Sequence, residues 1–299
     1  MNKIGSRRAA EVGLVANTAV WGATFILVKS ALAGVSPLLF LALRFSLATA
    51  VLLLFFHRRV KLSAAPLGHI FAGVLVGAFL FAGFALQTIG LEFTTAPKSA
   101  FLTGATSVMV PLLARLVYRT RPRHSEIAGL LVATLGMGLM TLEGPLGLLS
   151  VNRGDLLTLG CAVAFAAQIV TQGHFSKKMS FELLSVVQVA AAALLSGSLF
   201  WWEEAPRLAW RPSVVWAVMV TGVLATAVAF SVQAWAQHFT TATRTALIYM
   251  LEPVFAWLTS FLVAGEGLSI RAAAGAVLIL SGVILVEAKP LESRFHPSS

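Results

Sequence analysis

The segment that decides the fold is Phe93-Thr94-Thr95-Ala96-Pro97-Lys98-Ser99-Ala100, because it recurs 146 residues later as Phe239-Thr240-Thr241-Ala242-Thr243-Arg244-Thr245-Ala246. Five of the eight positions are identical, and the Lys/Arg and Ser/Thr replacements are chemically similar. Such a block, placed well inside the chain, indicates an internal duplication.

Other positions follow the same register. The shift of 146 places Gln87 on Gln233, and a shift of 144 aligns the preceding helices, with Glu11 on Asp155 and Ser36 on Ser180. We call residues related by these two shifts repeat-equivalent. The chain is predicted to consist of two copies of one unit, residues 1–149 and 150–299.

Both copies are strongly apolar. The 299 residues are 58% apolar and only 11% charged, and the mean hydropathy is +0.87. An average soluble chain is about 45–50% apolar and about 25% charged. This composition predicts a protein that lies in a lipid bilayer. It argues against a cytosolic enzyme, a disulfide scaffold and a disordered chain.

Ten stretches are long enough to be membrane-spanning helices, which need about 20 mostly apolar residues. They cover residues 11–32, 36–56, 67–91, 95–118, 125–142, 154–174, 181–202, 213–237, 241–263 and 271–288. Because five is an odd number, the second copy must enter the membrane from the opposite face. We therefore expect an all-α integral membrane protein with ten transmembrane helices, built as two inverted five-helix repeats around a central cavity.

The net charge of +10 fits this picture. Of the 22 Lys and Arg residues, 15 fall on the side of the N-terminus and 6 on the other, and Arg44 falls within a span. Positive residues accumulate on the cytoplasmic side of membrane proteins. Both termini are predicted to be cytoplasmic, in the inner or plasma membrane, and no nucleic-acid partner is expected.

Chemistry-bearing motifs are absent from the sequence. The single cysteine, Cys161, cannot form an internal disulfide, and no Cys/His cluster has zinc spacing. No protease, hydrolase, phosphate-loop or dinucleotide motif occurs. We expect no catalytic residue, no metal and no cofactor. The expected partners are a small-molecule substrate and the bilayer, in a monomer or homodimer.

Several short motifs, in order along both halves, resemble EamA-type transporters of the drug/metabolite transporter superfamily. They are Trp21-Gly22-Ala23-Thr24-Phe25, Leu43-Arg44-Phe45, Ala100-Phe101-Leu102-Thr103-Gly104, Leu251-Glu252-Pro253-Val254-Phe255 and Gly265-Glu266. One departure is Arg119-Thr120, where the resemblance implies Gly-Glu after the fourth helix. The resemblance covers residues 11–288 and implies ten helices, cytoplasmic termini and export or exchange of small metabolites.

Polar and aromatic side chains at helical spacing indicate the substrate site, because polar groups in a membrane protein favour the bundle interior. The alternative for any single one is interhelical hydrogen bonding. The predicted substrate-binding residues are Trp21, Thr24, Arg44, Gln87, Lys98, Thr103, Gln168, Gln233, Trp235 and Tyr249.

Glu252 is expected near the middle of a span, on one helix face with Thr245 and Tyr249. Protonation would relieve the cost of a charge there, so Glu252 is the predicted proton-coupling residue. Its alternative role is structural, at the break before Pro253. Arg44 could bind a substrate carboxylate, or pair with Glu252 or with a backbone carbonyl.

Lys98 and Arg244 are repeat-equivalent and begin the fourth and ninth predicted helices. A cation at a helix N-terminus requires a compensating anion. A lipid phosphate and an anionic substrate are the two candidates.

The fifth and tenth predicted helices carry small residues, among them Gly129, Gly136, Gly275 and Gly282. Small residues allow close helix packing, so these helices are predicted to be scaffold or a dimer face.

The function expected from these features is a secondary transporter that exports small metabolites such as amino acids by alternating access. An exchanger of phosphorylated or carboxylated metabolites is the alternative. An integral membrane enzyme is a remote one.

Overall fold

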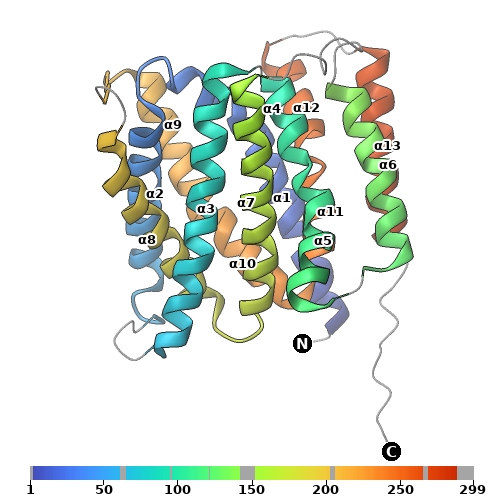
Figure 1. Ribbon diagram of the computed structural model, residues 1–299, viewed down its shortest axis with the longest axis horizontal. Coiled ribbons are helices and arrows are strands. Elements are labelled where there is room, and N and C mark those ends of the chain that lie inside the picture. Colours follow the sequence, from blue (N-terminus) through green and yellow to red (C-terminus); the bar gives the residue numbers. More distant parts are fainter. Residues whose placement is uncertain are drawn as a thin grey trace, which may run out of the picture.

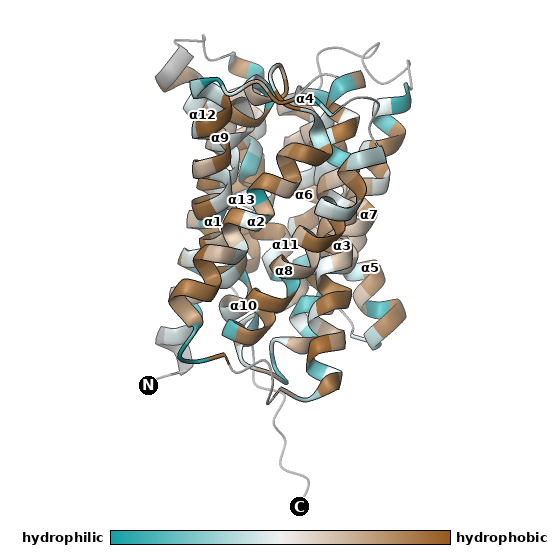
Figure 2. Ribbon diagram, turned by 90° about the vertical axis from the view of Figure 1, so that its left-hand side faces the viewer, coloured by the Kyte–Doolittle hydropathy of each residue, from teal (hydrophilic) through white to brown (hydrophobic). Residues whose placement is uncertain are grey.

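The computed structural model describes residues 3–60, 65–94, 96–120, 122–141, 152–202, 206–264 and 269–287. Every regular element in these ranges is helical, and one isolated β-bridge joins Val35 to Leu208. The helices stand side by side in one bundle (Figure 1). Figure 2 shows brown, apolar residues along the helices and teal residues mainly near the two ends of the bundle. Large apolar side chains such as Phe55 and Leu194 are exposed on the outside, as lipid contact requires.

Residues before 142 form six helices, and those after 152 form the others. The first set is α1 (Lys3–Ala31), α2 (Pro37–Phe56), α3 (Leu67–Phe93), α4 (Ala96–Gly104), α5 (Thr106–Tyr118) and α6 (His124–Thr141). The second set is α7 (Arg153–Phe175), α8 (Phe181–Leu199), η3 (Phe200–Trp202), α9 (Pro212–Gly222), η4 (Val223–Val228), α10 (Ala229–Phe239), α11 (Ala242–Tyr249), α12 (Glu252–Ala264) and α13 (Ile270–Glu287).

Seven helical stretches in the described ranges are long and apolar enough to cross a membrane. They correspond to α1, α2, α3, α4 with α5, α7, α8 with η3, and α9 to α10. Helices α6 and α13 are shorter apolar helices, His124–Met140 and Ile270–Val286. The remaining predicted span, residues 241–263, is divided between α11 and α12.

Two of the predicted helices, over 95–118 and 241–263, are broken near their middle; the break before Pro253 was expected, whereas the break within 95–118 was not. Helix α4 ends at Gly104 and α5 begins at Thr106, while α11 ends at Tyr249 and α12 begins at Glu252. Pro253 contributes to the second break because it has no N–H to donate to the carbonyl of Tyr249. The shift of 146 places Thr106 on Glu252, so both breaks fall at repeat-equivalent positions.

Helices α6 and α13 pack against each other through their glycines. A Cβ on Gly136 would lie 2.6 Å from the carbonyl oxygen of Gly275, and one on Gly129 would lie 2.5 Å from that of Gly282. Of the two predicted roles, scaffold or dimer face, these glycines therefore serve the scaffold. Their small size lets the two backbones touch.

Candidate functional site

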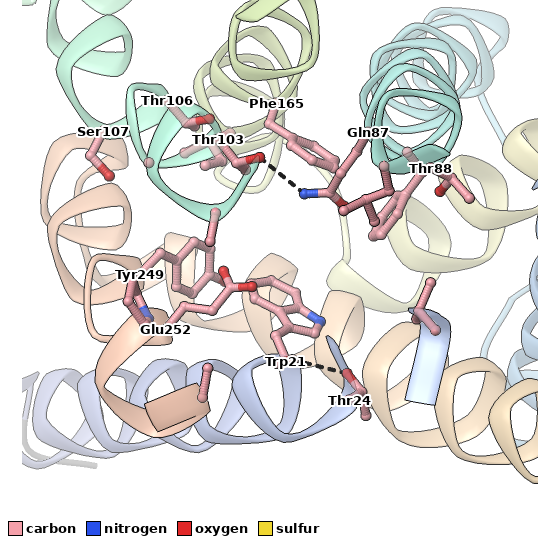
Figure 3. Close-up of a pocket in the computed structure, with 18 of the residues that line it drawn as sticks. Trp21, Thr24, Gln87, Thr88, Thr103, Thr106, Ser107, Phe165, Tyr249 and Glu252 are labelled. Carbon is pink, nitrogen blue, oxygen red and sulfur yellow. Dashed lines mark hydrogen bonds between the residues drawn. The ribbon is translucent and has the colours of Figure 1, made fainter. Parts of the chain in front are cut away.

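A cavity of about 360 Å³ lies in the middle of the bundle, a size in the ordinary range for small-molecule sites. Its walls come from both halves of the chain (Figure 3). Near one end of the bundle it is lined by Val28, Leu91 and Met140, which lie in the last turns of α1, α3 and α6. The cavity therefore extends from the centre toward the end of the bundle opposite the start of α1 and the end of α13 (Figure 1).

Nine of the eleven predicted site residues line this cavity. They are Trp21, Thr24, Arg44, Gln87, Thr103, Gln168, Gln233, Tyr249 and Glu252. Figure 3 shows Tyr249, Glu252, Trp21 and Thr24 on one side and Thr103, Gln87 and Phe165 on the facing side. The structure thus brings together residues that are up to 231 positions apart, from Trp21 to Glu252.

Arg44 is 4% exposed, and its guanidinium is held by the short π-helix η4. Its Nε donates to the hydroxyl of Thr226 at 2.7 Å, and a terminal nitrogen donates to the carbonyl of Ala225 at 3.2 Å. The guanidinium carbon lies 4.3 Å from the centre of the Phe84 ring. Within the described part of the chain, no carboxylate forms an ion pair with Arg44, so of its predicted internal partners the backbone carbonyl is the one present.

The π-helix is a feature that the sequence analysis missed. A π segment adds a residue to one turn, and such segments occur often at functional sites. Here the Ala225 carbonyl accepts a hydrogen bond from the Trp21 indole at 2.9 Å as well as from Arg44. The π-helix therefore holds Trp21 and Arg44, the two largest side chains among the predicted substrate-binding residues of the first half.

Glu252 is the only acidic side chain among the described residues that line the cavity. It occupies the first turn of α12, directly after the helix break. A negative group is favourable at a helix N-terminus. No basic side chain of the described residues pairs with it. Because the break separates it from Tyr249, the expected continuous helix face is corrected: the two residues reach the cavity from different helices.

Aromatic rings cover much of the cavity wall. Trp21 lies edge-on to Tyr249, with ring centres 4.7 Å apart, and 5.6 Å from Phe230. The ring centre of Phe84 lies 6.0 Å from that of Phe230 and 5.0 Å from that of Phe165. The substrate prediction omitted these three phenylalanines. Phe84 and Phe230 are repeat-equivalent, and so are Trp21 and Phe165, so comparing the two halves at aromatic positions would have found them.

Hydrogen bonds between polar residues connect the walls. The Gln87 amide donates to the Thr103 hydroxyl at 3.2 Å, and the Gln233 amide donates to Gln168 Oε1 at 3.1 Å. Thr103 is also 3.9 Å from the buried Cys161 sulfur. These contacts can rearrange around a ligand because each group can also bond to a polar substrate.

Lys98 does not line the cavity, contrary to expectation. Its ammonium pairs with Asp155 at 2.6 Å, and Asp155 also accepts from Thr94 at 2.7 Å. Asp155 closes the capping box of α7 with Asn152. The compensating anion of Lys98 is therefore an internal carboxylate instead of a lipid phosphate or a substrate.

Arg244 has a comparable position at the other end of the bundle. It is fully buried, 3.6 Å from Glu11 and 3.5 Å from Glu126, and it donates to the Val286 carbonyl at 3.3 Å. As with Lys98, the compensating anions are internal carboxylates, and not the predicted lipid phosphate or anionic substrate.

Trp235 is the second residue that the structure places elsewhere. The centre of its ring lies 5.5 Å from that of Phe239, and the indole packs against an apolar cluster formed by residues of α1, α6, α10, α11 and α13. Gly13 lies against it, since a Cβ there would be 3.7 Å from the indole. Trp235 is thus a packing residue in this conformation.

Among the described residues, no group of three metal-ligating side chains is present.

Known proteins resemble the chain over nearly its whole length. The sequence profile of the EamA-like transporter family matches residues 9–142 and again 152–288. An uncharacterized transporter of Archaeoglobus fulgidus is 34% identical over 94% of this chain and 86% of its own length. A probable amino-acid metabolite efflux pump of Salmonella typhimurium is 26% identical, over 89% of this chain and 90% of that one.

A solved crystal structure also superposes on the fold. Its TM-score is 0.79 at 20% sequence identity, and the match covers 94% of this chain and 98% of that chain. At that identity the likeness concerns the fold.

Proposed function

The chain belongs to the EamA-like transporter family, and from this premise we propose that it is a secondary transporter that exports small amino-acid-like metabolites by alternating access. Its relatives are named as transporters, and one is named a probable amino-acid metabolite efflux pump. These names also disfavour the membrane enzyme. The bilayer in question is the plasma or inner membrane.

We further propose that ten segments cross the membrane as two inverted repeats, residues 1–149 and 150–299, with both termini in the cytoplasm. Three observations support this arrangement: the family profile matches twice, the helix breaks at Ala105 and Met250–Leu251 are repeat-equivalent, and positive charge is concentrated on the side of the termini. In this orientation the cavity faces outward.

The observation that carries the proposal is the presence of one cation and one acid in a cavity whose other lining residues are aromatic, aliphatic or uncharged polar. Arg44 comes from the first half and Glu252 from the second, and neither has an opposite charge as a partner among the described residues. A planar guanidinium suits a carboxylate, and a carboxylate suits an ammonium. A zwitterion with an apolar side chain therefore complements the cavity: its carboxylate at Arg44, its ammonium at Glu252, its side chain among the rings.

Proton coupling follows from the same geometry. A charged carboxylate inside a membrane protein costs at least about 2.5–3.5 kcal/mol on insertion scales. Glu252 is therefore neutralised either by a proton or by the substrate ammonium. If the two compete for it, substrate moving out exchanges for a proton moving in, which is antiport.

The alternative, an exchanger of phosphorylated metabolites, would require several cations at the site. Arg44 is the only basic side chain of the described residues that lines the cavity, because Lys98 and Arg244 are held in ion pairs elsewhere. A doubly charged phosphate group is poorly matched to this single cation.

Ligand-induced thermal stabilisation of the purified protein tests the proposal. A ligand at 100 times its Kd stabilises the folded state by about 2.7 kcal/mol. We expect apolar amino acids to raise the Tm of the wild type and of Arg115→Ala, a control at an exposed arginine of α5, but not of Arg44→Ala. Stabilisation by sugar phosphates alone, or equal stabilisation of Arg44→Ala, would contradict it.

A further inference from the structure

Five of the six glutamines of the chain gather next to the cavity, toward the end of the bundle where α1 begins. They are Gln168, Gln172, Gln188, Gln233 and Gln237, from α7, α8 and α10, and we call them the glutamine cluster. Each is at most 1% exposed. Gln168 and Gln233 also form the floor of the cavity. Gln172 and Gln237 lie near the ends of α7 and α10, so the cluster extends toward the cytoplasmic end.

The cluster is connected but incompletely bonded. Gln168 Nε2 donates to Gln172 Oε1 and, at 3.3 Å, to Gln188 Oε1, and Gln237 donates to the carbonyl of Ile169 at 3.0 Å. Four amide atoms have no hydrogen-bond partner among the described residues: Nε2 of Gln172 and Gln188, and Oε1 of Gln233 and Gln237. Buried polar atoms are normally bonded, so four unbonded ones in a single cluster require a reason.

The repeat supplies that reason. The shift of 144 places Gln168, Gln172 and Gln188 on Thr24, Val28 and Arg44, and the shift of 146 places Gln233 and Gln237 on Gln87 and Leu91. All five of these repeat-equivalent residues of the first half line the open cavity. The glutamine cluster is thus the closed counterpart of a wall that is open in the first half.

We infer that the glutamine cluster is the wall of the inward-facing cavity, closed in this conformation, and a second binding subsite for the polar end of the substrate. The inference rests on the proposed function. When the halves exchange conformations, the second half adopts the open arrangement now seen in the first. The glutamine side chains then separate, and water from the cytoplasm enters between them. The four unbonded amide atoms then face water or substrate.

The chemistry of this subsite differs from that of the outward side. The position of Arg44 is occupied by the uncharged Gln188 in the second half. A carboxamide donates to a carboxylate and accepts from an ammonium, and it does so without the charge of a guanidinium. The substrate class is again a small zwitterion, held at the inward side by uncharged hydrogen bonds and at the outward side by the charge of Arg44.

Single-cysteine accessibility tests the inference without a known substrate. In a Cys161→Ala background, Gln188→Cys and Thr24→Cys are treated with a membrane-impermeant methanethiosulfonate on right-side-out and inside-out vesicles. The matched control is Ser185→Cys, because Ser185 is equally buried, lies on the same helix nearer the cytoplasmic end, and is equivalent to Leu41, which does not line the cavity.

We expect Thr24→Cys to react from the outside and Gln188→Cys from the cytoplasmic side, while Ser185→Cys stays unlabelled. If the inward state is populated at about 1–10%, Gln188→Cys reacts roughly 10–100 times more slowly than an exposed thiol. Gln172→Cys and Gln237→Cys give the same test should Gln188→Cys fail to fold, and labelling of either from the cytoplasmic side supports the inference.

The outcomes separate the two proposals. If Thr24→Cys reacts from the outside but no cluster position reacts from the cytoplasmic side, the cluster is a static structural core and the inference is wrong. Equal labelling of Ser185→Cys also overturns it, because depth alone would then explain the reaction. If Thr24→Cys fails to react from the outside, the orientation in the proposed function is wrong instead.

Discussion

Replacing Glu252 by Gln removes the one acidic side chain that the described cavity wall contains, and we expect it to abolish the proposed coupling of transport to protons. One carboxyl group carries one proton per cycle. One pH unit is 1.36 kcal/mol, so the wild type is expected to accumulate substrate up to about tenfold per unit of imposed pH difference. Proteoliposomes with an acidic lumen measure this directly, and Glu252→Gln should show no accumulation above equilibrium.

Binding should survive the substitution in weakened form. Gln keeps a side-chain oxygen that accepts a hydrogen bond from an ammonium, but the bond loses its charge assistance. The loss is about 1 kcal/mol, or roughly a fivefold weaker affinity. Exchange of labelled for unlabelled substrate across the membrane should therefore continue.

The control concerns the helix break. Glu252 is followed by Pro253 at the start of α12, so Pro253→Ala tests whether a change at the break alone abolishes coupling. It should lower stability but leave the response to pH intact. Full pH-driven accumulation by Glu252→Gln would refute the coupling role and leave the residue as part of the break.

Three further outcomes follow from the fold. Gly136→Val should destabilise the protein by about 1–3 kcal/mol, because its side chain meets the α13 backbone, whereas Gly197→Ala, with nothing within 4 Å, should not lower the Tm of the purified protein. Lys98→Ala should lower the Tm by leaving Asp155 as an unpaired buried charge, at a cost of about 3 kcal/mol, yet leave substrate affinity unchanged in a binding assay. Reporter fusions at residue 299 and within residues 206–211 should report opposite sides of the membrane, and same-side signals would overturn the predicted topology.

Most cavity residues could be predicted from the sequence because a bilayer restricts where polar groups go. Thr24, Gln87 and Gln233 have few favourable directions other than the bundle interior, and the repeat marks the pairs. Trp235 shows the limit of this reasoning. An indole is mostly apolar and packs equally well between helices, as it does beside Phe239.

The prediction that Lys98 binds substrate was wrong for a different reason. The sequence analysis aligned Lys98 with Arg244 and Glu11 with Asp155, but it did not connect the two alignments. In the structure each cation pairs with the acid of the opposite half. Lys98 of the first half pairs with Asp155 of the second, and Arg244 of the second half pairs with Glu11 of the first. Such pairing depends on which helices of opposite halves are neighbours, and helix periodicity does not contain that information.

The break before Pro253 could be predicted from the proline, but the helix break at Ala105 and the π-helix could not. Ala105 and the residues of η4 have ordinary helical sequences, and only tertiary contacts select the local geometry. The contact of Arg44 with Ala225 and Thr226 shows what η4 accomplishes, since it supplies both partners from one turn.

Counterflow in liposomes tests the central claim, alternating access at the Arg44 and Glu252 cavity, most directly. Vesicles containing the purified protein are loaded with an unlabelled apolar amino acid and diluted into a trace of the labelled one. The account predicts a transient rise of label inside loaded vesicles, no rise in empty vesicles, and loss of the signal in Arg44→Ala but not in Arg115→Ala. Label that equilibrates at the same rate in loaded and empty vesicles would instead indicate a passive pore and contradict the account.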